Sequence, residues 1–236
     1  MSDVLVVSGS YTPNPNDFAC LSESAERNQV PLFMKRGDFY PPYEVLFQRE
    51  IDFLRERPEK YFVYIDAHDV LVNRWDSVAV RKLIDESAAG VVIPTESHCW
   101  PPGPWCDVYE GRRTSPWCYV NGGGCAGYKQ PLIDLFNIWI DKIGENTLGA
   151  NQQLMHKMLG EGYPLTLDTE CVIWQTMLFM TPESRGHVVL RDGLAYNDVT
   201  GTFPMFLHFN GATPGIRKWY EALGYRDWKQ TGCKPE

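Results

Sequence analysis

Short apolar runs recur along this chain and alternate with segments in which apolar residues are spaced as in helices. The runs lie at 4–7, 61–65, 91–93, 165–167, 188–190 and 206–207. Runs of this length are typical of buried strands, because helices usually extend over about ten residues or more. We predict a strand at each run, with Ser8, Gly9 and Ser10 starting a loop after the first one.

Between these runs, apolar residues recur every three or four positions, which indicates amphipathic helices. One helix is expected around Phe47, Ile51 and Leu54, and another after Asp76, whose carboxylate can cap it. Further helices are expected at 132–143, 154–158 and 216–223, and an irregular segment at 101–116. The alternation predicts an α/β fold, with a Rossmann-like, mixed and mostly parallel sheet flanked by helices. Ligands of such sheets bind at the carboxyl ends of strands.

The length and composition indicate a single domain, which we place at residues 1–236. Hydrophobic residues make up 44% of the chain, enough to bury a sizeable core. The formal net charge of -8 argues against general binding to a nucleic-acid backbone. No apolar run reaches the length of a membrane-spanning helix, and the N-terminus does not resemble a signal peptide. We therefore expect a cytoplasmic protein with no membrane partner, and the sequence indicates no oligomeric state.

The chain has seven cysteines, an odd number, and we expect most of them to be free thiols. Cys99 and Cys106 have the same spacing as Cys118 and Cys125. Paired ligands of a structural zinc ion usually have only about two to four residues between them. We therefore favour buried thiols near the active site, with zinc as the alternative.

Two carboxylates, Asp66 and Asp69, follow a predicted strand at 61–65, where a loop should begin. Hard divalent cations prefer oxygen ligands, and one or two carboxylates can hold Mg²⁺ or Mn²⁺ against a diphosphate. The alternative is that Asp66 caps a turn and Asp69 is solvated. A distant histidine, His208, follows another predicted strand and precedes Asn210 and Gly211. Imidazole suits Mn²⁺ better than Mg²⁺, so His208 is a plausible third ligand, although a buried structural histidine is the alternative.

Three further segments carry candidate chemistry. Glu96 and Trp100 lie between the strand at 91–93 and the irregular segment, and the indole could stack on a sugar face or belong to the loop core. Asn121 precedes three glycines that allow a ligand to approach the backbone, or only form a tight turn. Asp168 follows a late strand, and either orients a substrate or stabilises a turn.

In this order, the segments IDAHD, TESHCWP, VNGGG, ANQQL, LTLDTECVIWQ and LHFNG resemble the glycosyltransferase domain of the procollagen lysyl hydroxylases, which is related to the collagen galactosyltransferases. That domain has a D-x-x-D metal motif, an A-E-S-x-C-W-P segment, an N-S-G-G turn, a D-D-Q helix start, an L-D strand and a terminal H-G-N-G. The resemblance extends from about Val4 to Tyr225, and six motifs in one order are far more specific than any of them alone.

The resemblance implies a GT-A fold, a UDP-sugar donor and Mn²⁺, with Mg²⁺ possible. Asp66, Asp69 and His208 would hold the metal. The residues implied for the nucleotide are Ser8, His68, Asn210, Gly211, Arg217 and Lys218, with His68 in the position of a tyrosine that stacks on uracil. The residues implied around the sugar are Glu96, Trp100, Asn121 and Asp168.

Departures from the family leave the acceptor open. Asn151 and Gln152 replace two acidic residues, and neither amide can act as a base. We therefore expect retention of anomeric configuration, with Asp168 and Glu96 as candidate bases if the reaction inverts. The acceptor could be a protein, a glycan or, as in phage enzymes, a hydroxymethylated nucleobase. A catalytically inactive nucleotide-sugar-binding module is the alternative to an enzyme.

Overall fold

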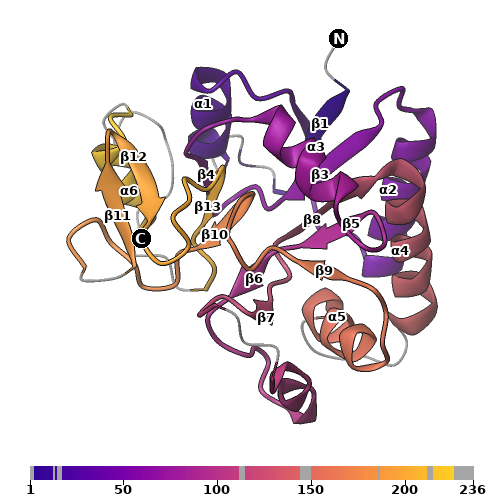
Figure 1. Cartoon of the computed structure of the whole chain (residues 1–236). Coiled ribbons are helices and arrows are strands. Elements are labelled where there is room, and N and C mark those ends of the chain that lie inside the picture. Colours follow the sequence, from indigo (N-terminus) through magenta and orange to yellow (C-terminus); the bar gives the residue numbers. More distant parts are fainter. Residues whose placement is uncertain are drawn as a thin grey trace.

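The computed structural model describes residues 3–12, 14, 18–111, 115–143, 150–184, 187–211 and 215–225. Its centre is a six-stranded sheet with the strand order β2-β1-β3-β8-β5-β9 (Figure 1). The strands are β1 (Val4–Ser10), β2 (Leu32–Arg36), β3 (Tyr61–Ile65), β5 (Val91–Ile93), β8 (Gly124–Tyr128) and β9 (Thr166–Leu167). Only β8 runs against its neighbours, which confirms the predicted α/β fold with a mixed, mostly parallel sheet.

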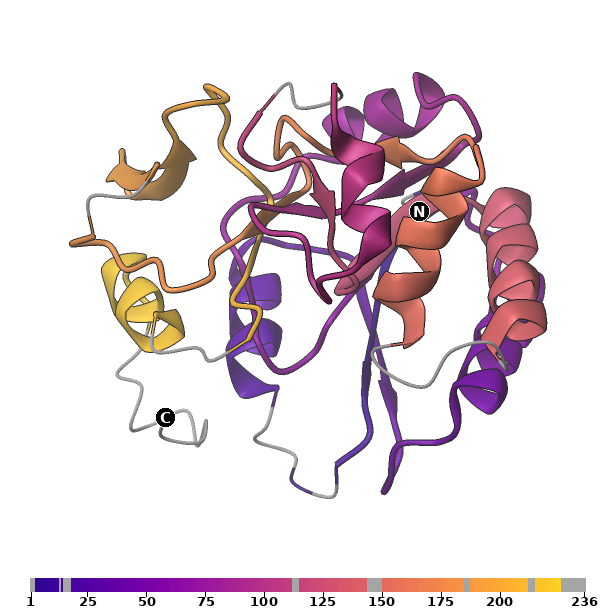
Figure 2. The same ribbon diagram turned by 90° about the horizontal axis from the view of Figure 1, so that it is seen from below.

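The alternation of side chains along the strands gives the sheet two buried faces. Leu5 and Val7 of β1 contribute to one hydrophobic cluster, and Val4 and Val6 contribute to the other. The helices α2 (Tyr43–Glu56) and α4 (Lys129–Lys142) lie side by side over the first face, followed by α5 (Ala150–Gly160) (Figures 1 and 2). The second face is covered by α1 (Ala19–Arg27) and α3 (Ser77–Asp85). Asp76 caps α3 as predicted, since its carboxylate accepts from the backbone N–H groups of residues 78 and 79.

A second, three-stranded sheet adjoins the first and brings in the late part of the chain. Its strand order is β10-β13-β4, formed by β10 (Trp174–Thr176), β13 (Phe206–His208) and β4 (Val70–Val72). Because β13 and β4 are antiparallel, His208 pairs directly with Val70. A short ribbon pairs β6 (Thr95–Glu96) with β7 (Tyr119–Val120). The pairing of β13 with β4 places His208 beside the residue that follows Asp69.

The remaining elements lie to the left of the main sheet in Figure 1. The strands β11 (Val188–Arg191) and β12 (Leu194–Asn197) form a hairpin, and α6 (Ile216–Ala222) packs near it. Both hairpin loop residues, Asp192 and Gly193, have positive φ, as the two-residue turn of a right-twisted hairpin requires. Among the described residues, no helix has the length and apolar character needed to cross a membrane.

Three local expectations are wrong. Ser8 to Ser10 belong to β1 and do not start a loop, because they pair with β2, an edge strand that the hydrophobic pattern does not indicate. The segment 101–116, expected to be irregular, contains the 3-10 helix η1 (Pro104–Tyr109), with a proline at its start. Cys99 and Cys106, expected to be free thiols, form a disulfide, which removes two of the four candidate zinc ligands. Disulfides persist mainly in oxidising compartments, so this one is unusual for a cytoplasmic protein. The cytoplasmic location stays a prediction.

Candidate active site

The polar residues predicted from the sequence meet where parallel strands of the main sheet end. Asp66 follows β3, and Glu96 follows β5 in the short strand β6. The antiparallel strand β8 begins at the same edge, because Gly124 pairs with Ile65. The loop before β8 therefore lies beside Asp66, whose backbone N–H donates to the carbonyl of Gly123 over 3.2 Å.

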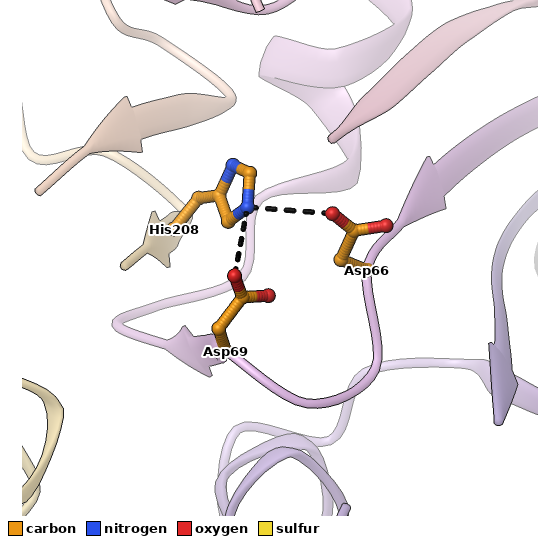
Figure 3. Close-up of side chains that lie close together, drawn as sticks. All are labelled: Asp66, Asp69 and His208. Carbon is orange, nitrogen blue, oxygen red and sulfur yellow. Dashed lines mark ion pairs between the residues drawn. The ribbon is translucent and has the colours of Figure 1, made fainter. Parts of the chain in front are cut away.

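Asp66, Asp69 and His208 converge on one point (Figure 3). His208 Nε2 lies 3.4 Å from Asp66 Oδ2 and 3.3 Å from Asp69 Oδ2. One ligand atom from each residue lies within 4.8 Å of the others, and the described residues contain no other such cluster. The backbone fixes this geometry, since the N–H of Phe209 donates to the carbonyl of Asp69 over 2.8 Å.

Asn121 orients the imidazole ring of His208. Its Oδ1 accepts the backbone N–H of Gly123 over 2.9 Å and lies 3.0 Å from His208 Nδ1. Because that amide oxygen is an acceptor, Nδ1 must carry the proton and donate it. The lone pair of a neutral His208 is then on Nε2, which faces both carboxylates. This is the tautomer that a metal-binding histidine needs, and the amide acts as its supporting partner.

The electrostatics of the cluster fit a divalent cation. Burial by itself would lower the pKa of His208, but the charges and hydrogen bonds of Asp69 and Asp66 raise this pKa to about 10. The buried imidazolium thus supplies positive charge between two carboxylates. A cation bound by the same three side chains would take over that role. The ring also lies against the backbone of Gly123, where a Cβ atom would be 2.0 Å from His208 Cε1.

Glu96 lies next to this cluster and is held by two amides. Its Oε2 accepts from Asn210 Nδ2 over 2.8 Å, and its Oε1 accepts a short hydrogen bond from Gln152 Nε2. Gln152 also donates to the carbonyl of Trp100 over 2.7 Å and accepts from the N–H of Gly122 over 2.9 Å. Burial raises the pKa of Glu96 to about 7, against the opposing effect of these hydrogen bonds. The sequence analysis noted Gln152 only as the replacement of an acidic residue. In the structure its amide links Glu96, Trp100 and Gly122.

Two adjoining cavities open at this sheet edge. The smaller one, of about 140 Å³, is lined by Ser8 and by four tyrosines, Tyr11, Tyr40, Tyr43 and Tyr64. The larger one, of about 710 Å³, contains all three residues of the cluster. The two cavities share six lining residues, which are Tyr40, Tyr43, Asp66, Gly122, Gly123 and Asn151. One extended ligand can therefore occupy both.

Most of the predicted site residues line these cavities. Ser8 lines the smaller one and donates its hydroxyl to the carbonyl of Ile65 over 2.9 Å. The other predicted residues that line the larger one are Glu96, Trp100, Asn121, Asn210 and Gly211. Trp100 is 64% exposed and so does not belong to the loop core.

Four predicted residues are not among the described residues that line either cavity. Asp168 is 1% exposed, and its carboxylate accepts backbone N–H groups from Val172, Ile173 and Trp174. The carboxylate of Asp168 therefore stabilises a turn, which is the second of the two roles expected from the sequence. Arg217 contacts Glu221 over 3.0 Å, Lys218 lies 3.4 Å from Glu183, and His68 is exposed.

Three aromatic residues of the cavities were missed by the sequence analysis. Tyr40 lies just before α2, Tyr43 begins it, and both line the two cavities, while Phe179 lines the larger one. Each lies in a loop or at a helix start, where the hydrophobic period does not indicate burial or function. The dense aromatic and proline content of residues 39–43 is the one signal that could have found the tyrosines.

Comparison with known proteins identifies the family. The model of the PLOD GT domain matches residues 45–219, which include the cluster of Asp66, Asp69 and His208, the glycine loop at 122–124 and the amides of Gln152 and Asn210 that hold Glu96. The chain belongs to the PLOD GT domain family. It is therefore a glycosyltransferase, which confirms the resemblance inferred from the motifs.

The fold of this PLOD-type glycosyltransferase is also found in a solved structure. A glycosyltransferase involved in the glycosylation of the major capsid of PBCV-1 superimposes with a TM-score of 0.54. The two are 15% identical, and the match covers 93% of this chain and 96% of that chain, so it establishes the GT-A-like fold alone. No curated protein matches the sequence.

Proposed function

We propose that this glycosyltransferase moves a hexose or a similar sugar from a UDP-sugar to a hydroxyl acceptor, with Mn²⁺ as its metal. The observation that carries the proposal is the cluster of Asp66, Asp69 and His208, in which Nε2 of the imidazole is directed at the two carboxylates. Two carboxylates and one imidazole suit Mn²⁺, and Mg²⁺ is the alternative. The metal, when bound, supplies positive charge that stabilises the departing diphosphate.

The residues of the chain supply the rest of the chemistry. Asp66 and Asp69 bind the cation as carboxylates, while Asn121 holds the proton of His208 on Nδ1. The tyrosines of the smaller cavity offer ring faces for the nucleoside, in the role that the resemblance gives to His68. Gly211 lines the larger cavity with φ +83, a backbone conformation in which a Cβ would be strained, and leaves room for the diphosphate. Glu96 and Trp100 face the transferred sugar.

The replacement of two acidic residues by Asn151 and Gln152 fits an enzyme with a built site better than an inactive module. Asn151 Nδ2 donates to the carbonyl of Gly122 over 2.7 Å, and Gln152 accepts from the N–H of the same residue. Both amides therefore hold the loop at 121–123, which lies against the ring of His208, and so support the geometry of the site.

The proposal is tested by UDP binding with and without metal. UDP with Mn²⁺ should raise the melting temperature, whereas UDP with excess chelator should not, because a ligand that binds only the folded state stabilises it. Asp69→Asn should abolish the metal-dependent shift and the turnover of UDP-sugars. Asp134→Asn, an exposed carboxylate on α4, is the matched control and should change neither. Full turnover in chelator, or in Asp69→Asn, would contradict the proposal.

A further inference from the structure

Phe179 is a large apolar side chain held in an unusual place. It is 65% exposed, lines the larger cavity and has a φ of +57°. This left-handed conformation is normal for glycine and uncommon for a bulky residue, so an aromatic side chain there needs a reason. Backbone outliers of this kind concentrate at ligand-binding sites.

The turn that presents Phe179 is anchored on both sides. The N–H of Met180 donates to the carbonyl of Met177 over 2.9 Å and closes the turn. The N–H of Met177 in turn donates to the carbonyl of His208 over 2.7 Å, and the indole N–H of Trp219 donates to the carbonyl of Met180 over 3.2 Å. The exposed phenyl ring of Phe179 is therefore carried by a turn that is hydrogen-bonded, through Met177, to the backbone of His208.

Trp100, the second exposed aromatic residue of this cavity, is anchored in a similar way. The disulfide between Cys99 and Cys106 fixes the preceding residue. The carbonyl of Trp100 accepts from Gln152 Nε2 over 2.7 Å and lies 2.9 Å from His156 Nε2. Two exposed aromatic rings on fixed backbones thus line one cavity, and a ligand that covers them gains affinity without first ordering the protein.

The charges of the cavity narrow the class of that ligand. Among the described residues that line it, there is no lysine or arginine, whereas Asp66, Asp69 and Glu96 are acidic. A nucleic acid needs cations for its phosphates, so a modified base in DNA does not fit. A pyranose ring has an apolar C–H face for an aromatic ring and hydroxyl groups for carboxylates and amides. Aromatic rings beside acidic and amide groups therefore suit a neutral sugar.

We propose that Phe179 is the platform of the acceptor site and stacks on a pyranose ring of a glycan acceptor, with Trp100 as the second aromatic wall. This inference rests on the proposed function and names its acceptor class. Phe179 lines only the larger cavity and so lies outside the smaller cavity, in which the nucleoside is proposed to bind.

The test is saturation-transfer NMR with methyl hexopyranosides, on protein that holds UDP and Mg²⁺, because paramagnetic Mn²⁺ would broaden the signals of a ligand bound beside it. Saturation should be strongest at ring C–H protons of the glycoside that binds. Phe179→Gly removes the ring and suits the positive φ, so the fold is kept, and the affinity should fall about tenfold. Phe179→Trp should retain binding. Phe39→Ala is the matched control, since Phe39 is 75% exposed and is not among the described lining residues of either cavity.

Two results would overturn the inference. One is equal glycoside affinity in Phe179→Gly and the wild type. The other is no glycoside binding together with binding of a hydroxylysine peptide or a hydroxymethylcytosine oligonucleotide, which would assign the cavity to protein or DNA. UDP binding is measured in the same samples. Its absence from the wild type would contradict the proposed function, and its presence without a Phe179 effect would contradict this inference alone.

Discussion

At the scale of single residues, the proton on His208 is the most informative feature. Without metal, the imidazole is buried between two carboxylates, which raise its pKa to about 10 against the effect of burial. A metal ligand must instead be neutral at Nε2. A metal bound as proposed would therefore compete with a proton on His208.

This competition predicts the pH dependence of metal binding. The Mn²⁺ dissociation constant should fall about tenfold for each pH unit between pH 6 and 8, because binding releases about one proton. Calorimetry in buffers with different ionisation enthalpies measures the number released. His187→Gln, which replaces an exposed histidine, should leave the number of released protons unchanged. A dissociation constant that does not vary with pH would show that metal binding displaces no proton from His208 in this range.

Replacing an exposed and a buried tryptophan distinguishes a loss of activity from a loss of packing. Trp100 is 64% exposed and Trp174 is 0% exposed. Trp100→Ala should lower kcat/KM about tenfold or more with little change in melting temperature, because it removes a sugar contact and little buried surface. Trp174→Ala should cost about 3–5 kcal/mol of stability. Thermal unfolding and steady-state kinetics of both variants check this, and a large loss of stability in Trp100→Ala would refute its role.

The sequence predicts site residues well where chemistry and strand position coincide. Asp66 and Asp69 come just after the apolar run at 61–65, so their place at the carboxyl edge of the sheet follows from the fold class. The place of His208 beside them depends on the pairing of β13 with β4. Asp168 satisfies the same pattern and yet stabilises a turn, because the pattern does not show which backbone N–H groups face a carboxylate. Phe179 escapes notice because its function depends on a φ angle and on exposure, neither of which the sequence shows.

At the scale of elements, the loop at 121–123 connects the supporting residues of the site. It enters β8 and contacts Asp66, His208, Asn151 and Gln152 through hydrogen bonds or close approach. Its glycines are needed for space, since a Cβ at Gly123 would lie 2.0 Å from His208 Cε1. The glycine run, which alone was weak evidence, is thus part of the site.

Gly123→Ala is therefore expected to displace the imidazole of His208. Mn²⁺ affinity should fall about 10–100-fold, the range seen when a supporting partner of a metal ligand is lost. Gly160→Ala is the control, because the nearest atom to its Cβ would be Val108 Cγ2 at 3.9 Å. Titration of both variants with Mn²⁺ measures the effect. Wild-type affinity in Gly123→Ala would contradict the packing described here.

The strands of the main sheet were predictable where they are buried on both faces, as at 61–65 and 91–93. The edge strand β2 was missed because its pattern mixes exposed and half-buried positions. Only the first strand of the hairpin at 188–197 was predicted, although Asp192 and Gly193 are a strong turn signal. The three-stranded sheet could not be predicted, because pairing between β13 and β4 joins residues more than 130 positions apart.

At the scale of the whole molecule, the last prediction concerns the stereochemistry of transfer. An inverting enzyme needs a general base near the acceptor hydroxyl. Asp66, Asp69 and Glu96 are the acidic residues among the described lining of the larger cavity. The first two are the proposed metal ligands, and both oxygens of Glu96 accept hydrogen bonds from amides.

Since Asp168 is enclosed by backbone N–H groups, the described residues of the site offer no unengaged carboxylate as a base, and we expect retention of anomeric configuration. Retaining transfer requires chiefly that the departing diphosphate be stabilised while positive charge develops on the sugar. NMR of the anomeric proton of the product distinguishes the two outcomes. An α-linked product from an α-linked donor is expected. A β-linked product would show inversion, and Glu96, whose pKa of about 7 suits a base, would then be the first residue to replace.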